Sequence, residues 1–596
     1  MTIDRETSGP KSGPERPSNE ILETSQVPAQ TSDEKTRHRI CIAVLLAVVV
    51  LAYGNSLWNA FTMDDLYLYI VNNPQVTEPS LRGLFAPHNI TKAFRPVTFG
   101  TFALDWKIGG GRPFEFHVVN LFLHAGVTVL LYLLLQILLQ GLPHGRGVGF
   151  VAALLFAVHP IHTEAVTSIV GRPELLAAGF LLASWILHLK DREIPALICF
   201  VLALLSKESA VAFLPLVVIG DYATGKWKPL LRYLRIAGLA LLYVGLLWKL
   251  QGGRFGPADI PLMDNPLVGI PAGPRILNAV RVAWKYVALQ FYPARLSCDY
   301  SYNQIPLYGD WRHMLPAAVL AVGVVGCWIW AIWKGRTSLA LAGGIYLASF
   351  ATTANILLPI GTIMGERLAY LPSSGFCLLI ALCWDWLHSR HQKVALGILC
   401  VVVAAMGVRT AVRNRDWKDN LTLVSAAVRA APGSAKMHYA LGLACVRAEQ
   451  FDLASKELQR ALQINPAYAE AMAAYGLLEA KLGNYQAAGR LMENAFYMTQ
   501  RDNRAYDEIA VNLATLYMET EHMDGALELL NREIAEKPGY AQAWAIRAMV
   551  HHKRGETAAA RADAEAALRL DPVNPQARNV LRLLNAPSRP VSETKH

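Results

Sequence analysis

Between residues 41 and 412 the chain is a succession of apolar runs separated by polar segments, most of them short. Such runs favour helices that span a membrane, because lipid offers no hydrogen-bond partner to an unpaired backbone. The composition agrees, since 53% of the 596 residues are hydrophobic and only 17% are charged. We therefore predict an all-α, polytopic membrane domain over residues 39–413.

The number of membrane spans depends on the run 277–293. If this run is an interfacial helix, the basic clusters near Lys334 and Lys393 lie in the cytoplasm, which the positive-inside bias favours. If it is a span, both clusters lie outside. About eleven spans are then predicted, with the N-terminus in the cytoplasm and the C-terminus outside. They are 41–58, 117–139, 147–158, 175–189, 194–206, 209–222, 233–250, 314–333, 338–358, 368–387 and 392–412.

This topology places the long loops 59–116 and 251–313 on the non-cytoplasmic side, together with the polar motifs at 159–174, 206–209 and 360–373. Residues 1–38 and 586–596 are polar and lack an apolar pattern, so we predict disordered tails, the first of them cytoplasmic. The net charge of +10 is explained by basic clusters between the apolar runs and does not indicate nucleic-acid binding.

From about residue 414 the sequence becomes Ala-rich and carries a period of 34 residues. Gly442 and Gly476 are 34 apart, as are Ala461 and Ala495, and Pro432, Pro466, Pro538 and Pro572 follow the same spacing with an insertion in the third unit. This period is typical of tetratricopeptide helix-turn-helix repeats, which bind extended polypeptide in a concave groove. We predict a repeat domain over 414–585. Its units are 435–468, 469–503, 504–540 and 541–574, and a purely structural stack is the alternative to a peptide-binding groove.

The stretch 157–176, AVHPIHTEAVTSIVGRPELL, has the densest set of polar groups among the apolar runs. On a helical wheel Glu164 and Arg172 fall on the polar side and His162 on the apolar side. The wheel predicts an amphipathic helix at the membrane surface, with its polar side facing water or a cavity. Arg172 lies at the edge of the wheel, just past Gly171.

Two adjacent carboxylates, Asp64 and Asp65, open the first long loop directly after a span. On an extended segment they point to opposite sides, so that one enters a cavity while the other orients or caps it. A carboxylate in such a cavity is a candidate general base toward a hydroxyl. The alternative is a pair that only caps the next helix.

Three basic residues, Arg172, Lys207 and Arg367, lie at span ends on the same side, close in sequence to carboxylates. Arginine suits phosphate, because its planar fork donates two hydrogen bonds to one oxyanion; the alternative is a headgroup contact by each residue alone. The paired carboxylates are Glu164, Glu174, Glu208 and Glu366. His117, Asn120 and His124 share one helix face, where hydrogen bonding inside the bundle is favoured over a metal site that lacks a third strong ligand.

Several blocks resemble the transmembrane-and-tetratricopeptide O-mannosyltransferases, in the same order along residues 40–585. They include the acidic pair after the first span, RPVTF, HVVNLFLH, VHPIHTEAVTSIVGRPELL, LLSKES and NILLPIGTIMGERLAYLPS. The resemblance implies a C-type membrane glycosyltransferase fold. It also implies an inverting enzyme that moves a sugar, typically mannose, from a dolichyl or polyprenyl phosphate to Ser or Thr hydroxyls of a protein on the non-cytoplasmic side.

The resemblance assigns the catalytic carboxylate to Asp64 and Asp65. It puts basic residues at the cavity rim on the donor phosphate, with Arg172 and Arg367 as candidates and Lys207 behind them. Further cavity residues, taken from the matching blocks, are Arg95, His124, Glu164 and Glu366. The acceptor is assigned to the repeat groove, 435–574. No metal site is predicted, although a divalent ion at the phosphate is left open.

Two other functions fit parts of the chain: a non-catalytic membrane-anchored scaffold for protein complexes, and a transporter. A transporter needs motifs on both membrane faces, whereas the cytoplasmic loops here are short and merely basic. Asn89 and Asn420 match N-glycosylation acceptor triplets but do not separate a bacterial plasma membrane from the endoplasmic reticulum. No Walker, Rossmann or zincin motif is present.

Overall fold

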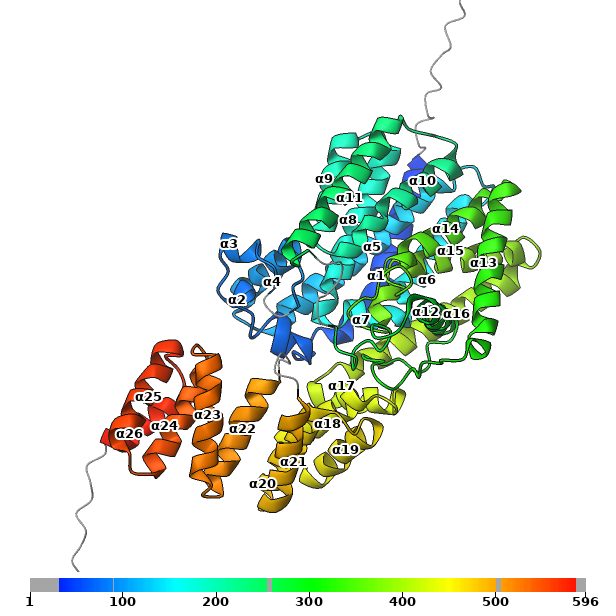
Figure 1. Cartoon of the computed structure of the whole chain (residues 1–596). Coiled ribbons are helices and arrows are strands. Elements are labelled where there is room, and N and C mark those ends of the chain that lie inside the picture. Colours follow the sequence, from blue (N-terminus) through cyan, green and yellow to red (C-terminus); the bar gives the residue numbers. More distant parts are fainter. Residues whose placement is uncertain (1–31, 89–90, 254–259, 500–504, 586–596) are drawn as a thin grey trace, which may run out of the picture. The chain divides into compact units, whose positions relative to one another are not determined.

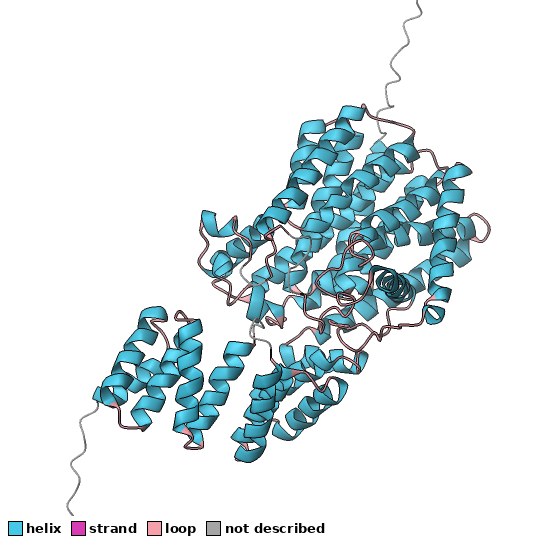
Figure 2. Cartoon of the chain, viewed as in Figure 1, coloured by secondary structure: helices cyan, strands magenta, loops and turns pink. Residues whose placement is uncertain are grey.

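The computed structural model describes residues 32–88, 91–253, 260–499 and 505–585, without the side chain of Tyr67. Throughout these ranges the regular secondary structure is helical and no strand occurs, which confirms the all-α prediction (Figure 2). The chain divides into two compact units, Met1–Val44 and Leu45–His596. Most of the predicted tails lies outside the described residues, but helix α1 already begins at Ser32, inside the predicted N-terminal tail.

Each of the eleven predicted spans contains a helix. Six helices are long and apolar enough to cross a membrane, or seven if the bent pair Gly145–Val158 and Pro160–Val166 is one span, so eleven spans are not confirmed. The eleven are α1 (Ser32–Tyr53), α5 (Pro113–Leu138), α6 (Gly145–Val158), α8 (Arg172–Leu189), α9 (Glu193–Leu204), α10 (Phe213–Thr224), α11 (Leu230–Leu250), α13 (Leu315–Trp333), α14 (Thr337–Ala351), α15 (Pro372–His388) and α16 (Gln392–Asp416).

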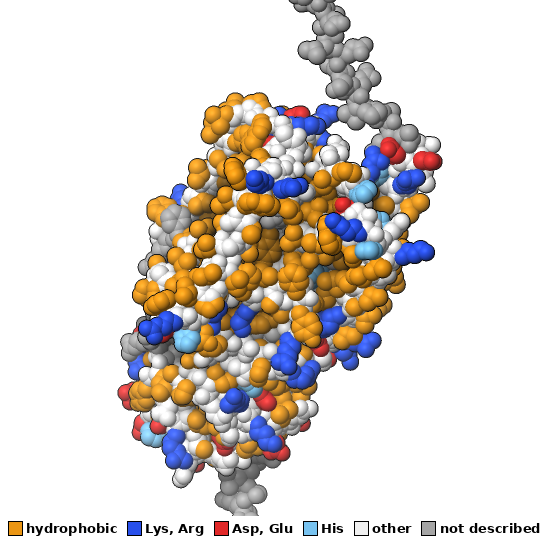
Figure 3. All heavy atoms as spheres, turned by 90° about the vertical axis from the view of Figure 1, so that its right-hand side faces the viewer, with side chains coloured by type: hydrophobic (Ala, Val, Ile, Leu, Met, Phe, Trp, Pro, Cys, Tyr) orange, Lys and Arg blue, Asp and Glu red, His pale blue; other side chains and the backbone are white. Residues whose placement is uncertain are grey.

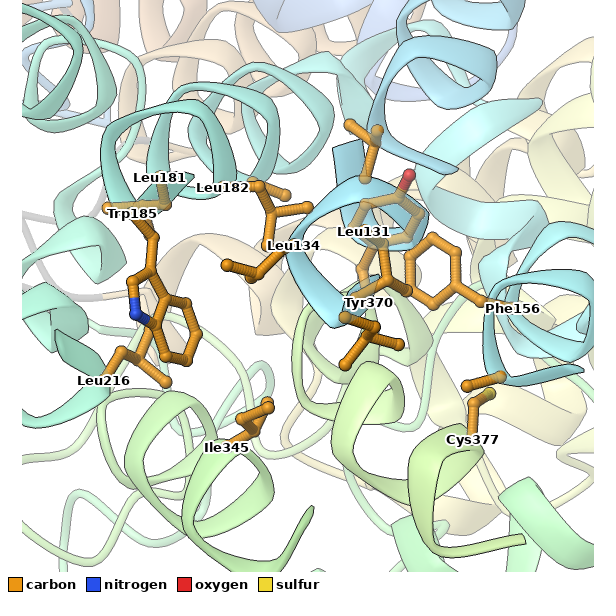
Figure 4. Close-up of a cluster of buried hydrophobic side chains, with 14 of the residues drawn as sticks. Leu131, Leu134, Phe156, Leu181, Leu182, Trp185, Leu216, Ile345, Tyr370 and Cys377 are labelled. Carbon is orange, nitrogen blue, oxygen red and sulfur yellow. The ribbon is translucent and has the colours of Figure 1, made fainter. Parts of the chain in front are cut away.

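The core of this bundle is built where α5, α6, α8 and α15 pack together (Figures 1 and 4). Leu131 and Leu134 of α5, Phe156 of α6 and Trp185 of α8 are almost completely buried in one cluster. Burying side chains of this size contributes roughly 1.5–3 kcal/mol each in water, and in lipid their close packing is the main attraction between helices.

Helices α13 and α16 expose most of their apolar side chains. Only 6% of the apolar window of α13 and 11% of that of α16 are buried. Figure 3 shows a broad hydrophobic band on this face of the molecule, with Lys and Arg gathered above and below it. An apolar band of this extent is unfavourable in water and requires an apolar surrounding.

Helix α12 (Ala272–Phe291) covers the run predicted to be interfacial. It is not among the helices long and apolar enough to span, and Figure 1 views it nearly end-on while neighbouring helices run across the picture. Its buried face carries polar groups, Asn278 and Gln290, beside Val282 and Tyr286. This orientation supports the interfacial interpretation.

The first long loop is folded instead of being an extended polar segment. It forms η2 (Asp65–Tyr69), α2 (Pro74–Thr77), α3 (Leu81–Leu84) and the 14-residue helix α4 (Pro96–Gly109). Pro96 begins α4, where its missing N–H costs no hydrogen bond. The backbone of Val97 and the hydroxyl of Thr98 donate to carbonyls of Leu205 and Ser206, which joins α4 to the end of α9.

The tetratricopeptide prediction is confirmed by four helix pairs, preceded by α17 (Asn420–Ala430) and followed by α26 (Pro575–Asn585). A methyl group on Gly442 or Gly476 would lie 2.6 Å from Leu458 Cγ or Met492 Cγ, which explains why small residues recur there. The extra residues of the third unit fall between Met498 and Tyr506, mostly outside the described residues. The pairs are α18 (Ala435–Arg447) with α19 (Phe451–Ile464), α20 (Ala469–Lys481) with α21 (Tyr485–Met498), α22 (Tyr506–Glu519) with α23 (Met523–Glu536), and α24 (Ala541–Lys553) with α25 (Thr557–Leu570).

If lipid covers α13, Val322→Lys destroys membrane insertion, because a Lys near the centre of a span costs about 2.5–3.5 kcal/mol. Val322 is 73% exposed, so in water the same change would be nearly neutral. Leu570→Lys on α25, at a site 46% exposed, is the matched control and leaves the yield unchanged. The measurement is the amount of monodisperse protein recovered from carbonate-washed membranes; equal recovery of both variants contradicts a lipid-facing α13.

Candidate functional site

A pocket forms where η2, α4, the start of α8 and the turn η7 (Glu366–Ala369) meet. It brings together three of the residues predicted from the sequence, Asp64, Arg95 and Arg367. The remaining lining residues are Tyr69, Thr98, Phe99, Phe102, Val170 and Pro173. One carboxylate and two guanidinium groups therefore share a mostly aromatic and apolar pocket.

Asp64 supplies the carboxylate of the pocket. Within the described residues it makes no hydrogen bond and no ion pair, and it is only partly buried. Its charge raises the pKa of Arg367, after the larger effect of Glu164, so the two groups lie within electrostatic range. Asp64 is thus free to accept a proton from a bound molecule.

Asp65 has a different environment, although it is the next residue. It is buried, its Oδ2 accepts from the backbone N–H of Thr62 (2.9 Å), and its Oδ1 accepts from the N–H of Val170 (3.2 Å). The pair was expected on an extended segment; in fact Asp64 has helical dihedrals and Asp65 begins η2. The two side chains still diverge, one to the pocket and one to the bundle.

Burial raises the pKa of Asp65 to about 7, although the N–H groups of Thr62 and Val170 partly oppose the shift. A pKa near neutrality also suits a general base. However, both carboxylate oxygens of Asp65 are occupied and the residue does not line the pocket. Geometry therefore favours Asp64 as the reacting carboxylate and Asp65 as its support.

Arg95 and Arg367 both line the pocket with their guanidinium groups, although they lie far apart in the sequence. Arg95 donates from Nε and Nη2 to Glu208 at 3.0 and 2.6 Å, which is the bidentate geometry. Arg367 pairs with Glu164, which also accepts from the Arg367 backbone N–H at 3.0 Å. Each carboxylate occupies one edge of a guanidinium and leaves further N–H donors available.

The ion pairs change how readily these side chains titrate. Partial loss of solvent would by itself raise the pKa of Glu208, whose side chain is still 47% exposed, but the charge and hydrogen bonds of Arg95 outweigh it and lower the pKa to about 2. The pKa of Arg367 is raised, chiefly by Glu164. Both arginines are therefore fixed cations with defined orientations.

Lys207 lies behind this pocket instead of lining it. It is buried and pairs with Glu174 of α8. Burial lowers its pKa, and the neighbouring charge of Arg95 lowers it further. Lys207 therefore lies within electrostatic range of Arg95 but does not line the pocket.

The structure contradicts the lipid-phosphate geometry expected for Arg172. The residue is fully buried, and its guanidinium binds Asp105 (2.5 Å), the side chain of Asn120 (2.8 Å) and the carbonyl of Phe116 (2.9 Å). It stacks over Phe102, 4.6 Å from the ring centre, so it lies behind a wall of the pocket. Protein groups already occupy the donors that a phosphate would need.

Two other predicted cavity residues, Glu366 and His124, also lie away from the pocket. Glu366 accepts from the N–H of Ser297 (2.6 Å) and the hydroxyl of Tyr300 (2.7 Å), and burial raises its pKa to about 8. His124 forms a hydrogen bond with the hydroxyl of Tyr370 at 2.7 Å, and Tyr370 belongs to the cluster drawn in Figure 4. Hydrogen bonding within the bundle therefore explains His124, as it does His117, which bonds the carbonyl of Asn59.

The stretch 157–176 is not one amphipathic helix at a surface. It forms η3 (Pro160–His162), α7 (Thr163–Val166) and η4 (Ile169–Gly171) before α8, and its polar side chains are buried, Glu164 among them. A methyl group on Gly171 would lie 2.4 Å from the carbonyl of Ala165, so the chain turns back on itself where only glycine fits. Glu164 reaches the pocket by holding Arg367.

The pocket also contains residues that sequence reasoning missed. Tyr69 stacks against Phe99, with ring centres 6.4 Å apart, and lines the pocket beside Asp64. The available signal was its place five residues after Asp64, in the short segment that follows the acidic pair. In the described part of the chain, no group of three or more His, Cys, Asp or Glu side chains is arranged to hold a metal ion.

Comparison with known proteins gives both repeat and enzyme relatives. Residues 406–467 and 511–575 match the family model "Tetratricopeptide repeat". The chain is 32% identical over 444 residues to a protein O-mannosyl-transferase of Caenorhabditis elegans, covering 72% of this chain and 63% of that protein. It is 26% identical to human Protein O-mannosyl-transferase TMTC3, covering 85% and 61% of the two chains.

The resemblance inferred from the motifs is thereby confirmed: the curated relatives are TMTC-type protein O-mannosyl-transferases. The chain spans about three fifths of the length of these relatives. Among solved structures, the MamA crystal structure shares 20% identity over 26% of this chain and 86% of that chain, with a TM-score of 0.23.

The burial of Arg172 generates a stability prediction. Arg172→Met leaves Asp105 buried without its partner and lowers the free energy of unfolding by about 3–5 kcal/mol. Arg172→Met combined with Asp105→Leu restores most of that loss, because a buried ion pair replaced by apolar groups is close to neutral.

The control is Arg112→Met, which breaks an ion pair whose arginine side chain is 72% exposed and costs about 1 kcal/mol or less. The measurement is thermal unfolding of the purified protein in detergent. A single Arg172→Met variant as stable as Arg112→Met would contradict the structural role and return Arg172 to the candidates for the donor phosphate.

Proposed function

We propose that the chain transfers a sugar, mannose in the first instance, from a polyprenyl- or dolichyl-phosphate carrier to Ser or Thr hydroxyls of a protein. The observation that carries the proposal is that Asp64 shares one pocket with the oriented guanidinium groups of Arg95 and Arg367, while its carboxylate makes no hydrogen bond or ion pair within the described residues. The names of the curated relatives support the same class of reaction. The chemistry requires a base for the acceptor and cations for the leaving phosphate.

In this mechanism Asp64 accepts the proton of the acceptor hydroxyl as its oxygen attacks the anomeric carbon. The bond between that carbon and the phosphate oxygen breaks, and the lipid phosphate leaves with the bonding electrons. Arg95 and Arg367 stabilise the negative charge that develops on it, and Lys207 adds to the potential from behind. A single displacement inverts the anomeric centre.

The walls of the pocket assist this step. Phe99 and Phe102 of α4 are almost completely buried and line it beside the charged groups. Apolar walls exclude water, which strengthens the interactions between the arginines and a phosphate and limits hydrolysis of the donor. Because Arg95 and Arg367 are already held by carboxylates, little reorganisation is needed when charge develops.

The proposal also includes the membrane location of the protein, its topology and its acceptor. The exposed apolar faces of α13 and α16 support a multi-pass membrane domain of the C-type glycosyltransferase fold, in a bacterial plasma membrane or the endoplasmic reticulum. We assign eleven spans, with the pocket and the repeat domain on the non-cytoplasmic side. The repeat groove, 435–574, recruits the polypeptide acceptor.

Asp64→Asn abolishes sugar transfer without a change in folding. Loss of a general base typically costs about 10²–10⁴-fold in kcat, and Asp64 makes no hydrogen bond within the described residues that the fold would lose. Asp65→Asn mainly lowers thermal stability, because the charged acceptor of two N–H groups is replaced. The measurement is transfer of radiolabelled mannose from dolichyl-phosphate mannose to Ser/Thr peptides, alongside thermal unfolding.

Arg95→Gln is the matched donor-side variant. Its partner Glu208 is 47% exposed, so the fold tolerates the change, while the KM for the lipid donor rises. Wild-type activity of Asp64→Asn would reject the assigned base. Absence of transfer and of donor hydrolysis by the wild type with dolichyl- and undecaprenyl-linked donors would favour the non-catalytic scaffold.

The proposed topology has a separate test in alkaline phosphatase fusions, since that enzyme becomes active only outside the cytoplasm, where its disulfides form. A fusion after Pro432 is expected to be active and a fusion after Arg336 inactive. Activity of the second fusion would make α12 a span and reverse the assignment of α13.

A further inference from the structure

The side chain of Asp64 makes no hydrogen bond or ion pair to any residue that the structure describes, so its position depends on the residues on either side. Asp65 is tied to the bundle through Val170, as described above. On the other side, the backbone N–H of Met63 donates to Oδ1 of Asn420 at 3.0 Å. Asn420 is the first residue of α17, the helix that opens the repeat domain.

Met63 is held to the repeat domain in a second way. Its side chain packs against the cluster formed by α17, α18 and α19, which contains Val424, Leu441 and Leu458. One turn earlier, the N–H of Ala60 donates to the carbonyl of Lys418 at 2.9 Å. The segment that leads into the pocket is therefore attached to residues 418–458 at three points.

The backbone of Met63 is strained in a manner that makes this attachment necessary. Its φ is +39°, a left-handed conformation that residues other than glycine rarely adopt. Such a conformation persists only where surrounding contacts overcome its cost, and it is found at sites that need a side chain aimed in one direction. The bond from Met63 to Asn420 and the apolar packing of its side chain supply those contacts.

We propose that Asn420 is a positioning residue for Asp64, so that the first helix of the repeat domain is part of the catalytic site and not only a recruiting module. This inference rests on the proposed function, since it concerns the aim of the same carboxylate. Asn420 acts through Met63: it holds the strained turn, and the turn directs Asp64 toward Arg367. The base is then correctly placed only while α17 is docked.

This role also explains the position of the triplet Asn420-Leu421-Thr422 in the structure. The side chain of Asn420 is partly buried and its carbonyl oxygen is occupied by Met63, in the first turn of a helix capped by Asp419. The triplet therefore has a structural role; the other triplet, at Asn89, lies outside the described residues.

The experiment compares three variants of the full-length protein in nanodiscs. Asn420→Ala removes the acceptor oxygen and lowers kcat about 10- to 100-fold, as expected when a catalytic group is displaced by about 1 Å, with the KM for dolichyl-phosphate mannose unchanged. Asn420→Asp keeps an oxygen at the same place and retains most of the activity. Thr422→Ala destroys the glycosylation triplet but leaves Asn420 in place, and it behaves as the wild type.

A second measurement does not depend on activity. Hydrogen exchange of a peptide covering residues 59–66 is expected to accelerate in Asn420→Ala and to stay unchanged in Thr422→Ala, because only the first loses the bond to the Met63 N–H. Unaltered exchange and kcat in Asn420→Ala would overturn the positioning role, as would equal losses in Asn420→Ala and Asn420→Asp. If the wild type transfers no sugar while exchange responds as expected, the proposed function fails and the attachment stands.

Discussion

The packing of the bundle depends on hydrogen-bond partners for a stretch of backbone that lies deep among the helices and is not itself a regular helix. Between His159 and Arg172 the chain forms only short turns, so carbonyl groups are left without helical partners in an apolar interior, where each unpaired group is costly. Asn120 of α5 supplies the missing donors: its Nδ2 lies 3.2 and 3.1 Å from the carbonyls of Val166 and Ser168. Its Oδ1 accepts from Arg172, whose charge is balanced by Asp105.

This buried network is what creates the pocket. With Asn120 and Arg172 occupied in supporting the turn, the N–H of Val170 is directed to Asp65, and Glu164 reaches Arg367. The side chains that carry charge into the pocket are therefore held by the same turn from two sides. If this stretch were a regular helix, its carbonyls would be hydrogen-bonded within the helix, but the contacts of Val170 with Asp65 and of Glu164 with Arg367 would be lost.

Much of the architecture could be predicted from the periodicity of the sequence, because the spacing of small and apolar residues indicates which side chains pack against one another. The 34-residue spacing of Gly442 and Gly476 predicted the repeats for the reason the structure gives, close packing against Leu458 and Met492. The acidic pair was also found from the sequence. The burial of single side chains could not be predicted from the sequence. Arg172 and Arg367 are the same residue type, and both lie at the end of a predicted span. Only the fold shows that Arg172 forms a buried ion pair and that Arg367 lines the pocket. Their carboxylate partners come from segments remote in sequence, and no local pattern distinguishes them.

The pairing of every pocket cation with a carboxylate determines what kind of ligand the site favours. In the pocket, Arg95 and Arg367 are matched by Glu208 and Glu164, which leaves the charge of Asp64 in excess; behind the pocket, Lys207 is matched by Glu174. A free inorganic anion therefore gains little from net charge and must be attracted by directed N–H donors instead. A carrier whose lipid chain is held independently by the membrane can deliver its phosphate to such donors without relying on long-range attraction. In the proposed reaction, the pocket is therefore better suited to an anchored donor than to a soluble phosphate.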